Sequence, residues 1–353
     1  MKKTVLSTML ITALTVGTSF AMKPVIIEDQ GSFMAGGSVI TTPGTYEGNT
    51  NPQKTSGETL HGDHAYVFYQ KPVKAHKNAL VFLHGYGQSG KTWETTPDGR
   101  DGFQNIFLEK GYKTYIVDQP RRGRAGQSTV PQRIPAMPDD QLWYNNFRIG
   151  QWPKKFDHVA VTDDAAWREQ FFRQMTPNTG AYDTNVISDA MTAVFDKAGD
   201  GVLVTHSQGG VPGWYTAIKS SHVKGIIAIE PGSFLFPEQD VPPVEETTSP
   251  FPAVGIGVSN AAFMKLTKVP ILVLFGDNIP QEKTNIWGLD NWRVRLHLAK
   301  KWADIVNAHG GDATIISLPD KGIYGNTHFM MSDSNNKQVA DVMEQWMKDK
   351  HIQ

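Results

Sequence analysis

Short apolar runs alternate with helix-like segments along most of the chain. Buried strands are predicted for the runs at residues 78–84, 112–117, 202–204, 223–229, 271–275 and 313–318. Helices are predicted over residues 183–197, 211–219, 291–309 and 339–348. Two further strands are expected earlier, at residues 38–40 and 65–69. Strands that alternate with helices indicate an α/β fold, in which a mostly parallel sheet has helices on both faces.

Several predicted strands are followed, directly or after a loop, by residues of the types that take part in catalysis. These are Gly85-Tyr86, Ser207, Glu230, Asp277 and His328. Ligands of open α/β sheets bind at the carboxyl ends of the strands. We therefore expect these residues to face a single crevice.

Ser207 stands between a buried strand and a helix, in the sequence Thr205-His206-Ser207-Gln208-Gly209. A strand, a sharp turn that carries a serine, and a helix form the geometry of a nucleophile elbow. Gly209 supplies a small residue where the backbones crowd, whereas Thr205 occupies the place of the first glycine in the G-x-S-x-G pattern. The pentapeptide alone is equally compatible with a serine in an ordinary strand-to-helix loop.

A serine nucleophile needs a base, and the base needs a third group that orients it. Among 11 histidines we favour His328, which follows the last predicted strand in a glycine-containing loop. His297 lies within a predicted helix and His309 at its end, while His206 directly neighbours the serine. The alternative for His328 is a loop histidine with a purely structural role.

An acyl-transfer site also needs two donors for the developing oxyanion. The backbone N–H of Gln208, the residue after the serine, is the first candidate. The second is the N–H of Tyr86, in the loop after the strand that ends at His84. Glycines at positions 85, 87 and 90 let this loop approach a substrate closely, although they are equally compatible with a plain turn.

Residues 129–180 are rich in proline and aromatic residues and interrupt the alternation of strands and helices. Because ligand pockets are mostly apolar, we predict that this insertion contributes a cap over the crevice. Trp143 and Trp152 are the candidate substrate-binding residues. The alternative is that the aromatic residues complete the core, which we expect for some of them, such as Phe171.

Charge and cysteine content narrow the classes of partner. The 34 basic and 35 acidic residues give a net charge of −1, which offers no reason to expect a nucleic acid or a membrane surface as partner. The absence of cysteine removes disulfides and thiolate chemistry. His61 and His64 have no further ligands beside them, so we predict no metal site.

The first 21 residues have the pattern of a signal peptide. Lys2 and Lys3 precede a mostly apolar stretch, which ends at the small-residue site Ser19-Phe20-Ala21. The apolar run is shorter than the roughly 20 residues that span a bilayer. We therefore predict a single domain over residues 22–353, located in the periplasm or the medium of a bacterium.

The ordered motifs of the chain resemble the α/β-hydrolase superfamily over nearly all of the mature sequence. They are His84-Gly85-Tyr86-Gly87, the segment 118–124, Thr205-His206-Ser207-Gln208-Gly209 and Gly325-Asn326-Thr327-His328-Phe329. Two further segments are similar to a branch of secreted bacterial esterases, namely residues 31–37 and Ile229-Glu230-Pro231-Gly232. The resemblance implies an α/β-hydrolase fold, a small-molecule ester as substrate, and hydrolysis without a cofactor.

The resemblance leaves the triad acid to be chosen. Members of the superfamily usually place an aspartate three residues beyond a glycine after the seventh strand, which here is Ile279. Asp277 comes one residue after that glycine, and Glu230 ends the preceding strand. A glutamate reaches one methylene further than an aspartate, which suits an approach from the neighbouring strand. We therefore favour Glu230 and keep Asp277 as the alternative.

The predicted function is that of a serine esterase with Ser207, His328 and Glu230 as its triad. Two other functions remain open. An amidase or lactonase can use the same scaffold, because a fold does not determine a substrate. A binding protein that has kept the fold without catalysis is the third possibility, which the pair of Ser207 and His328 argues against.

Overall fold

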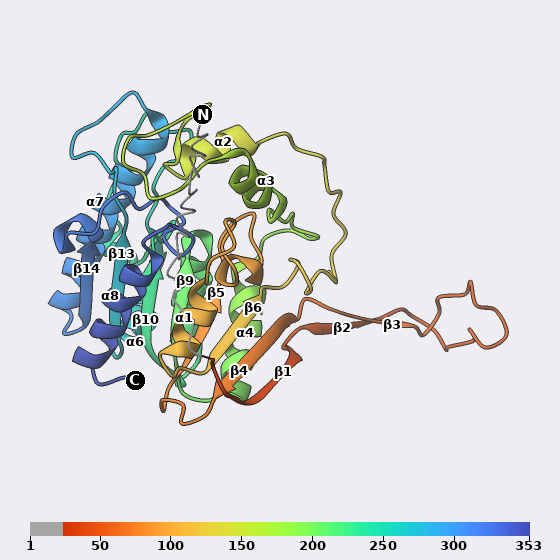
Figure 1. Ribbon diagram of the computed structural model, residues 1–353. Helices are drawn as coiled ribbons and strands as arrows, with labels where there is room; N and C mark the ends of the chain where they lie inside the picture. The colour runs from red at the N-terminus through yellow and green to blue at the C-terminus, as the bar shows by residue number, and fades with distance from the viewer. Residues whose placement is uncertain (1–23) are drawn as a thin grey trace, which may run out of the picture.

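An eight-stranded sheet forms the centre of the computed structural model, which describes residues 24–353 (Figure 1). Its strands are β1 (Ile27–Ala35), β4 (Ala65–Pro72), β5 (Ala79–Leu83), β6 (Thr114–Asp118), β9 (Gly201–His206), β10 (Val223–Ile229), β13 (Pro270–Phe275) and β14 (Asp312–Ser317). They are arranged in the order β1-β4-β6-β5-β9-β10-β13-β14. The pairs β1–β4 and β4–β6 are antiparallel, and the pairs from β6 to β14 are parallel.

Helices cover both faces of this sheet. One face carries α4 (Thr184–Ala198), α5 (Gly210–Lys219), α6 (Asn260–Leu266) and α7 (Trp287–Ala308), and the other carries α1 (Phe103–Glu109) and α8 (Asn336–Asp349). The alternation of side chains along each strand divides the core accordingly. In β9, Leu203 packs on the α4–α7 side, while Val202 and Val204 pack on the α1–α8 side. The predicted fold class is confirmed.

The insertion at residues 129–180 forms two short helices, α2 (Asp140–Asn146) and α3 (Ala165–Arg173), and a small ribbon of β7 (Gly150–Gln151) and β8 (Lys154–Lys155). Figure 1 shows α2 and α3 together at one end of the sheet. Tyr144, Phe147, Trp167 and Phe171 are buried in the core on the α1–α8 side. Much of the insertion therefore completes the core, as expected for Phe171.

Two strands near the N-terminus are absent from the sequence prediction. β1 is an edge strand in which most residues are exposed or half-buried, so it carries little apolar signal. β3 (Thr59–Gly62) pairs with β2 (Ser38–Thr41) in a ribbon that extends away from the sheet in Figure 1. A strand without a buried face has no alternation to detect.

The predicted signal peptide, residues 1–21, lies outside the described residues. From residue 24 onward, no helix has both the length and the apolar composition needed to cross a membrane.

Candidate active site

Ser207 occupies a tight turn between β9 and α5. It begins a short 3-10 helix (Ser207–Gly209) and has a φ of 54°, in the left-handed region that costs energy for a residue other than glycine. Strained backbone of this kind gathers at functional sites, where the surrounding structure enforces it. A Cβ on Gly209 would lie 2.5 Å from the carbonyl oxygen of His84, so the turn requires a glycine there.

Thr205 causes less crowding in the turn than the sequence suggests. Its methyl group lies 2.6 Å from the position that a Cβ on Gly213 of α5 would occupy. The helix therefore accommodates the threonine because Gly213 has no side chain. The missing first glycine of the pentapeptide is compensated within α5.

Sheet register places Glu230 beside Ser207. Ile229 pairs with His206 on one side and with Leu274 on the other, so the residues that follow β9 and β10 are neighbours. Glu230 is fully buried, and its Oε2 lies 2.6 Å from His328 Nδ1. Its carboxylate also accepts a hydrogen bond from the Gly276 N–H at 2.7 Å.

Arg148 provides a fully buried counter-charge to Glu230. Its Nη1 donates to Glu230 Oε2 at 2.8 Å, and its Nη2 donates to Oε1, which makes the pair bidentate. Burial alone would raise the pKa of Glu230. The charge of Arg148 and the hydrogen bond with His328 outweigh burial and lower this pKa to about 2. Glu230 is therefore ionised across the neutral pH range.

His328 is held on all sides. Its ring packs against Trp292 in a tilted arrangement with the ring centroids 4.1 Å apart, and it lies 4.4 Å from the ring of His206, the residue before Ser207. Its backbone N–H donates to the carbonyl oxygen of Phe147 at 2.9 Å. Burial lowers the pKa of His328, Glu230 raises it, and the positive charges of Arg148 and Arg295 lower it further, so that it lies below its ordinary value.

One nitrogen of His328 is left for chemistry. Nε2 is buried and has no hydrogen-bond partner among residues 24–353. Ser207 Oγ makes no hydrogen bond with it in this arrangement, and such bonds often tighten only when substrate binds. A buried imidazole with a carboxylate on Nδ1 and an unpaired Nε2 has the form of a general base.

Asp277 contacts the loop that carries His328, and not its ring. Its Oδ2 accepts the Gly325 N–H at 2.7 Å, and its Oδ1 accepts the Asn278 N–H at 2.7 Å. Asp333 holds the same loop from the other side, because it accepts from the Thr327 N–H at 2.7 Å. The two aspartates therefore fix the backbone around His328.

The two predicted oxyanion donors lie on segments that touch. A Cβ on Gly85 would lie 2.8 Å from the Cβ of Ser207, so the loop that carries Tyr86 packs directly on the elbow. Neither the Tyr86 N–H nor the Gln208 N–H donates a hydrogen bond to another described residue. Both amides are free to bind an oxyanion beside Ser207.

Comparison with known proteins supports the assignment of the fold. The model of the alpha/beta hydrolase family matches residues 80–349. The chain belongs to the alpha/beta hydrolase family. It is 27% identical over 305 residues to the "Probable secreted lipase phiG" of a fungal species (strain ATCC 74256), across 76% of this chain and 81% of the lipase.

A solved structure shows the same similarity in three dimensions. It is described as "The Atomic Resolution Structure of a Novel Bacterial Esterase", with a TM-score of 0.74 and 29% sequence identity. The match covers 93% of this chain and 97% of the esterase chain. This alpha/beta hydrolase thus has both a lipase and an esterase among its relatives.

A cavity of about 380 Å³ opens beside Ser207. Tyr86, Trp143 and Gln208, all selected from the sequence, line it together with Ser207. Trp152, the other tryptophan predicted to bind substrate, does not line this cavity, which corrects the prediction. It lines a separate depression with Arg168 of α3. It packs edge-on against Tyr144 with the ring centroids 5.3 Å apart.

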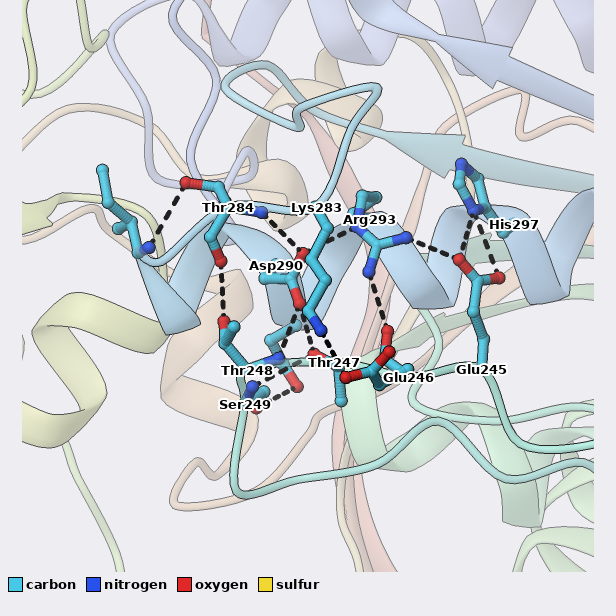
Figure 2. A network of polar contacts seen from close by, with 12 residues as sticks. Glu245, Glu246, Thr247, Thr248, Ser249, Lys283, Thr284, Asp290, Arg293 and His297 are labelled. Atoms are coloured by element: carbon cyan, nitrogen blue, oxygen red, sulfur yellow. Dashed lines mark hydrogen bonds and ion pairs between the residues drawn. The ribbon is translucent and has the colours of Figure 1, made fainter.

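α7 contributes Asn291, Trp292 and Arg295 to the wall of the cavity. Figure 2 shows the polar network that fastens loops to this helix. Asp290 accepts from the Thr248 N–H at 2.8 Å and from Arg293 Nε at 2.6 Å. These contacts hold the segment before Phe251, another lining residue, against α7.

Two arginines of the site were missed by the sequence analysis. Arg148 lies in the insertion with a φ of 58°, and Arg295 lies within a predicted helix. An arginine between apolar neighbours, as in Phe147-Arg148-Ile149, was the only available signal for Arg148. Its partner Glu230 is 82 positions away in the chain, so local patterns carry no information about the pair.

Proposed function

We propose that this alpha/beta hydrolase is a serine esterase that cleaves carboxylic esters through an acyl-enzyme on Ser207. The observation that carries the proposal is the strained serine at the end of β9, next to the buried pair of His328 and Glu230. The lipase and esterase relatives favour esters over other acyl substrates.

The proposed mechanism assigns one task to each group. His328 Nε2 removes the proton of Ser207 as its Oγ attacks the ester carbonyl, and it later donates this proton to the leaving alcohol. Glu230 accepts the Nδ1–H bond and stabilises the imidazolium that forms. The N–H groups of Tyr86 and Gln208 stabilise the oxyanion of the tetrahedral intermediate. Water, activated by His328, then releases the acid from Ser207.

The size and lining of the cavity support a small ester as substrate. Trp143 from α2 packs against Tyr86 with the ring centroids 4.6 Å apart, so the insertion and the oxyanion loop form one side of the cavity. This contact supports the proposal that residues 129–180 contribute a cap to a single domain over residues 22–353. The apolar N-terminal pattern and the secreted lipase relative support a periplasmic or extracellular location.

The test is reaction with a serine-directed p-nitrophenyl phosphonate, followed by peptide mapping, and hydrolysis of p-nitrophenyl esters of increasing chain length. We expect labelling at Ser207, with loss of both labelling and turnover in Ser207→Ala at an unchanged melting temperature. A protein that is neither labelled nor active would be a binding protein. Labelling combined with turnover of p-nitroanilides or lactones alone would identify an amidase or a lactonase.

A further inference from the structure

Arg295 brings a positive charge to the cavity that contains Ser207. It projects from α7 next to Trp292, with its guanidinium carbon 5.5 Å from the centre of the indole ring. Its Nη1 donates to the carbonyl oxygens of Asn291 at 3.0 Å and of Phe251 at 3.2 Å, and to the side-chain oxygen of Asn291. These contacts hold one nitrogen of the guanidinium in place.

The remaining donors of Arg295 have no partner. Its Nε and Nη2 make no hydrogen bond to any residue from 24 to 353, and no carboxylate of that part of the chain lies within 4.0 Å of it. The neighbouring arginines differ in this respect. Arg148 is paired with Glu230, and Arg293 is paired with Asp290 and Glu245.

Arg295 is half-buried in the wall of the cavity, and a charge that is partly removed from water gains from an ionic partner. Burial lowers the pKa of Arg295 to about 10, so the guanidinium still carries its charge at neutral pH. The guanidinium presents its donors in a planar fork that matches the two oxygens of a carboxylate. Trp292 and Phe251 line the same cavity and provide apolar surface beside this fork.

We propose that Arg295 forms an anion subsite and that the preferred esters carry a carboxylate. The proposal rests on the proposed esterase function, because it describes the substrate of the same site. Since the subsite and Ser207 share a cavity of about 380 Å³, the carboxylate and the reacting ester belong to one small molecule. The charged group can lie on the acyl or on the alcohol side of the ester, and the test separates the two.

Two pairs of esters provide the test, each with a charged member and a neutral member of the same shape. On the alcohol side these are p-acetoxybenzoate and p-acetoxybenzamide. On the acyl side they are the p-nitrophenyl monoesters of glutaric acid and of its monoamide. kcat/KM is measured for each with the wild type and with Arg295→Met, and the ratio of charged to neutral ester is compared.

We expect this ratio to fall by about tenfold to a hundredfold in Arg295→Met for one of the two pairs, since hydrogen bonds to charged groups are of that strength. Arg295→Lys should recover part of the preference, because it restores the charge without the fork. Arg173→Gln is the control for overall charge, since Arg173 is exposed on α3 and paired with Glu169. It should leave the ratio unchanged.

An equal loss for both members of both pairs would overturn the proposal, because it would show that Arg295 acts through the cavity wall or through the charge near His328. An unchanged ratio would overturn it as well. KM and kcat are reported separately, since a carboxylate bound equally in the ground and transition states changes KM alone.

Failure of the proposed esterase function gives a different result, namely no turnover of any of the four esters. In that case the subsite is tested by calorimetric titration of Ser207→Ala with p-hydroxybenzoate and p-hydroxybenzamide. Binding of the carboxylate that is weakened by an added Arg295→Met substitution supports the subsite. Equal binding of the two compounds, or no binding, overturns it.

Discussion

Glu230 and Asp277 stand at the ends of neighbouring parallel strands, one residue beyond β10 and two residues beyond β13. Glu230 turns through a φ of 42° and reaches the imidazole of His328. Asp277 instead accepts two backbone N–H groups, one of which belongs to the loop that carries His328. A difference of one residue in the distance from the strand end therefore decides what the carboxylate contacts. Glu230 contacts the imidazole ring of His328, whereas Asp277 contacts the loop that carries His328.

The surroundings of the two carboxylates differ in the same sense. Glu230 is fully buried and neutralised by Arg148, which holds it ionised in a dry environment. Asp277 is half-buried, and its backbone carbonyl, not its side chain, contacts Arg148, at 2.9 Å from Nε. A desolvated and ionised carboxylate interacts more strongly with an imidazolium than a solvated one does. These differences support the electrostatic role that we propose for Glu230.

The largest effect is expected for Glu230→Gln. The amide keeps the length of the side chain but loses the charge that stabilises the imidazolium of His328. We expect kcat for a p-nitrophenyl ester to fall by about 10⁴-fold, as the loss of a triad carboxylate can produce. Steady-state kinetics of Glu230→Gln and Asp277→Asn, side by side, make the check. A loss of that size in Asp277→Asn alone would reverse the assignment.

The second-largest effect is expected for Arg148→Met, which removes the counter-charge of Glu230. Removal of one partner of a buried ion pair leaves the other charge uncompensated, which costs about 3–5 kcal/mol of stability. We expect a large decrease in the free energy of unfolding in urea, together with reduced kcat. Arg168→Met is the matched control, because its contact with Asp163 is 3.7 Å long and its side chain is 29% exposed. Equal stability of the two variants would show that Glu230 does not need Arg148 as its counter-charge.

Asp277→Asn is expected to act on stability more than on catalysis. Asparagine keeps one acceptor oxygen, so one of the two N–H groups of Gly325 and Asn278 loses its partner. The expected cost is about 1–3 kcal/mol, the penalty of an unsatisfied polar group in a partly buried position. Thermal unfolding measures it, with the exposed Asp320→Asn as a control. A variant with native stability and lost kcat would show that Asp277 acts on the chemistry.

Trp143 and Trp152, which both lie in the insertion at residues 129–180, differ in a similar way. Trp143 lines the Ser207 cavity, whereas Trp152 lines another depression. Loss of an aromatic contact worth about 1 kcal/mol corresponds to about a fivefold increase in KM. We expect that increase for aromatic esters in Trp143→Ala and an unchanged KM in Trp152→Ala. The same KM in both variants would remove Trp143 from the substrate site.

The smallest effect is a shift in pH dependence. His328 must be neutral to act as a base, so kcat/KM rises as the pH increases through its pKa. Burial and the two nearby arginines hold that pKa below 6.5. The acid limb should therefore lie below pH 6.5 and move to higher pH in Arg295→Met, because a positive charge is removed. A limb that moves to lower pH would contradict this electrostatic account.

The sheet and the order of the site residues could be predicted from the sequence because both depend on local patterns. Apolar runs located β5, β9, β10 and β13, and the residues directly after these strands include Ser207 and Glu230. The choice of Glu230 stays a prediction, and its contact with His328 agrees with it. Parallel register then brings distant segments to one edge of the sheet.

The remaining features depend on contacts between segments far apart in the chain. Arg148 reaches Glu230 from an irregular insertion, through a backbone with positive φ that no periodicity marks. Composition alone selects Trp152 for the substrate site, although it packs against Tyr144 and lines a separate depression. Gly213 compensates for Thr205 only because a helix approaches the strand closely at that point. Each of these is a property of packing, not of sequence pattern.

The proposed function requires an acyl-enzyme on Ser207, and this intermediate can be trapped. The protein is mixed with excess p-nitrophenyl butyrate, quenched in acid during turnover, and analysed by intact mass and peptide mapping. We expect a mass increase equal to one butyryl group, located on the peptide that contains Ser207. This increase should be absent in Ser207→Ala. An adduct on another residue would contradict the proposed mechanism. Rapid turnover by the wild type without any adduct, combined with continued turnover in Ser207→Ala, would contradict it as well.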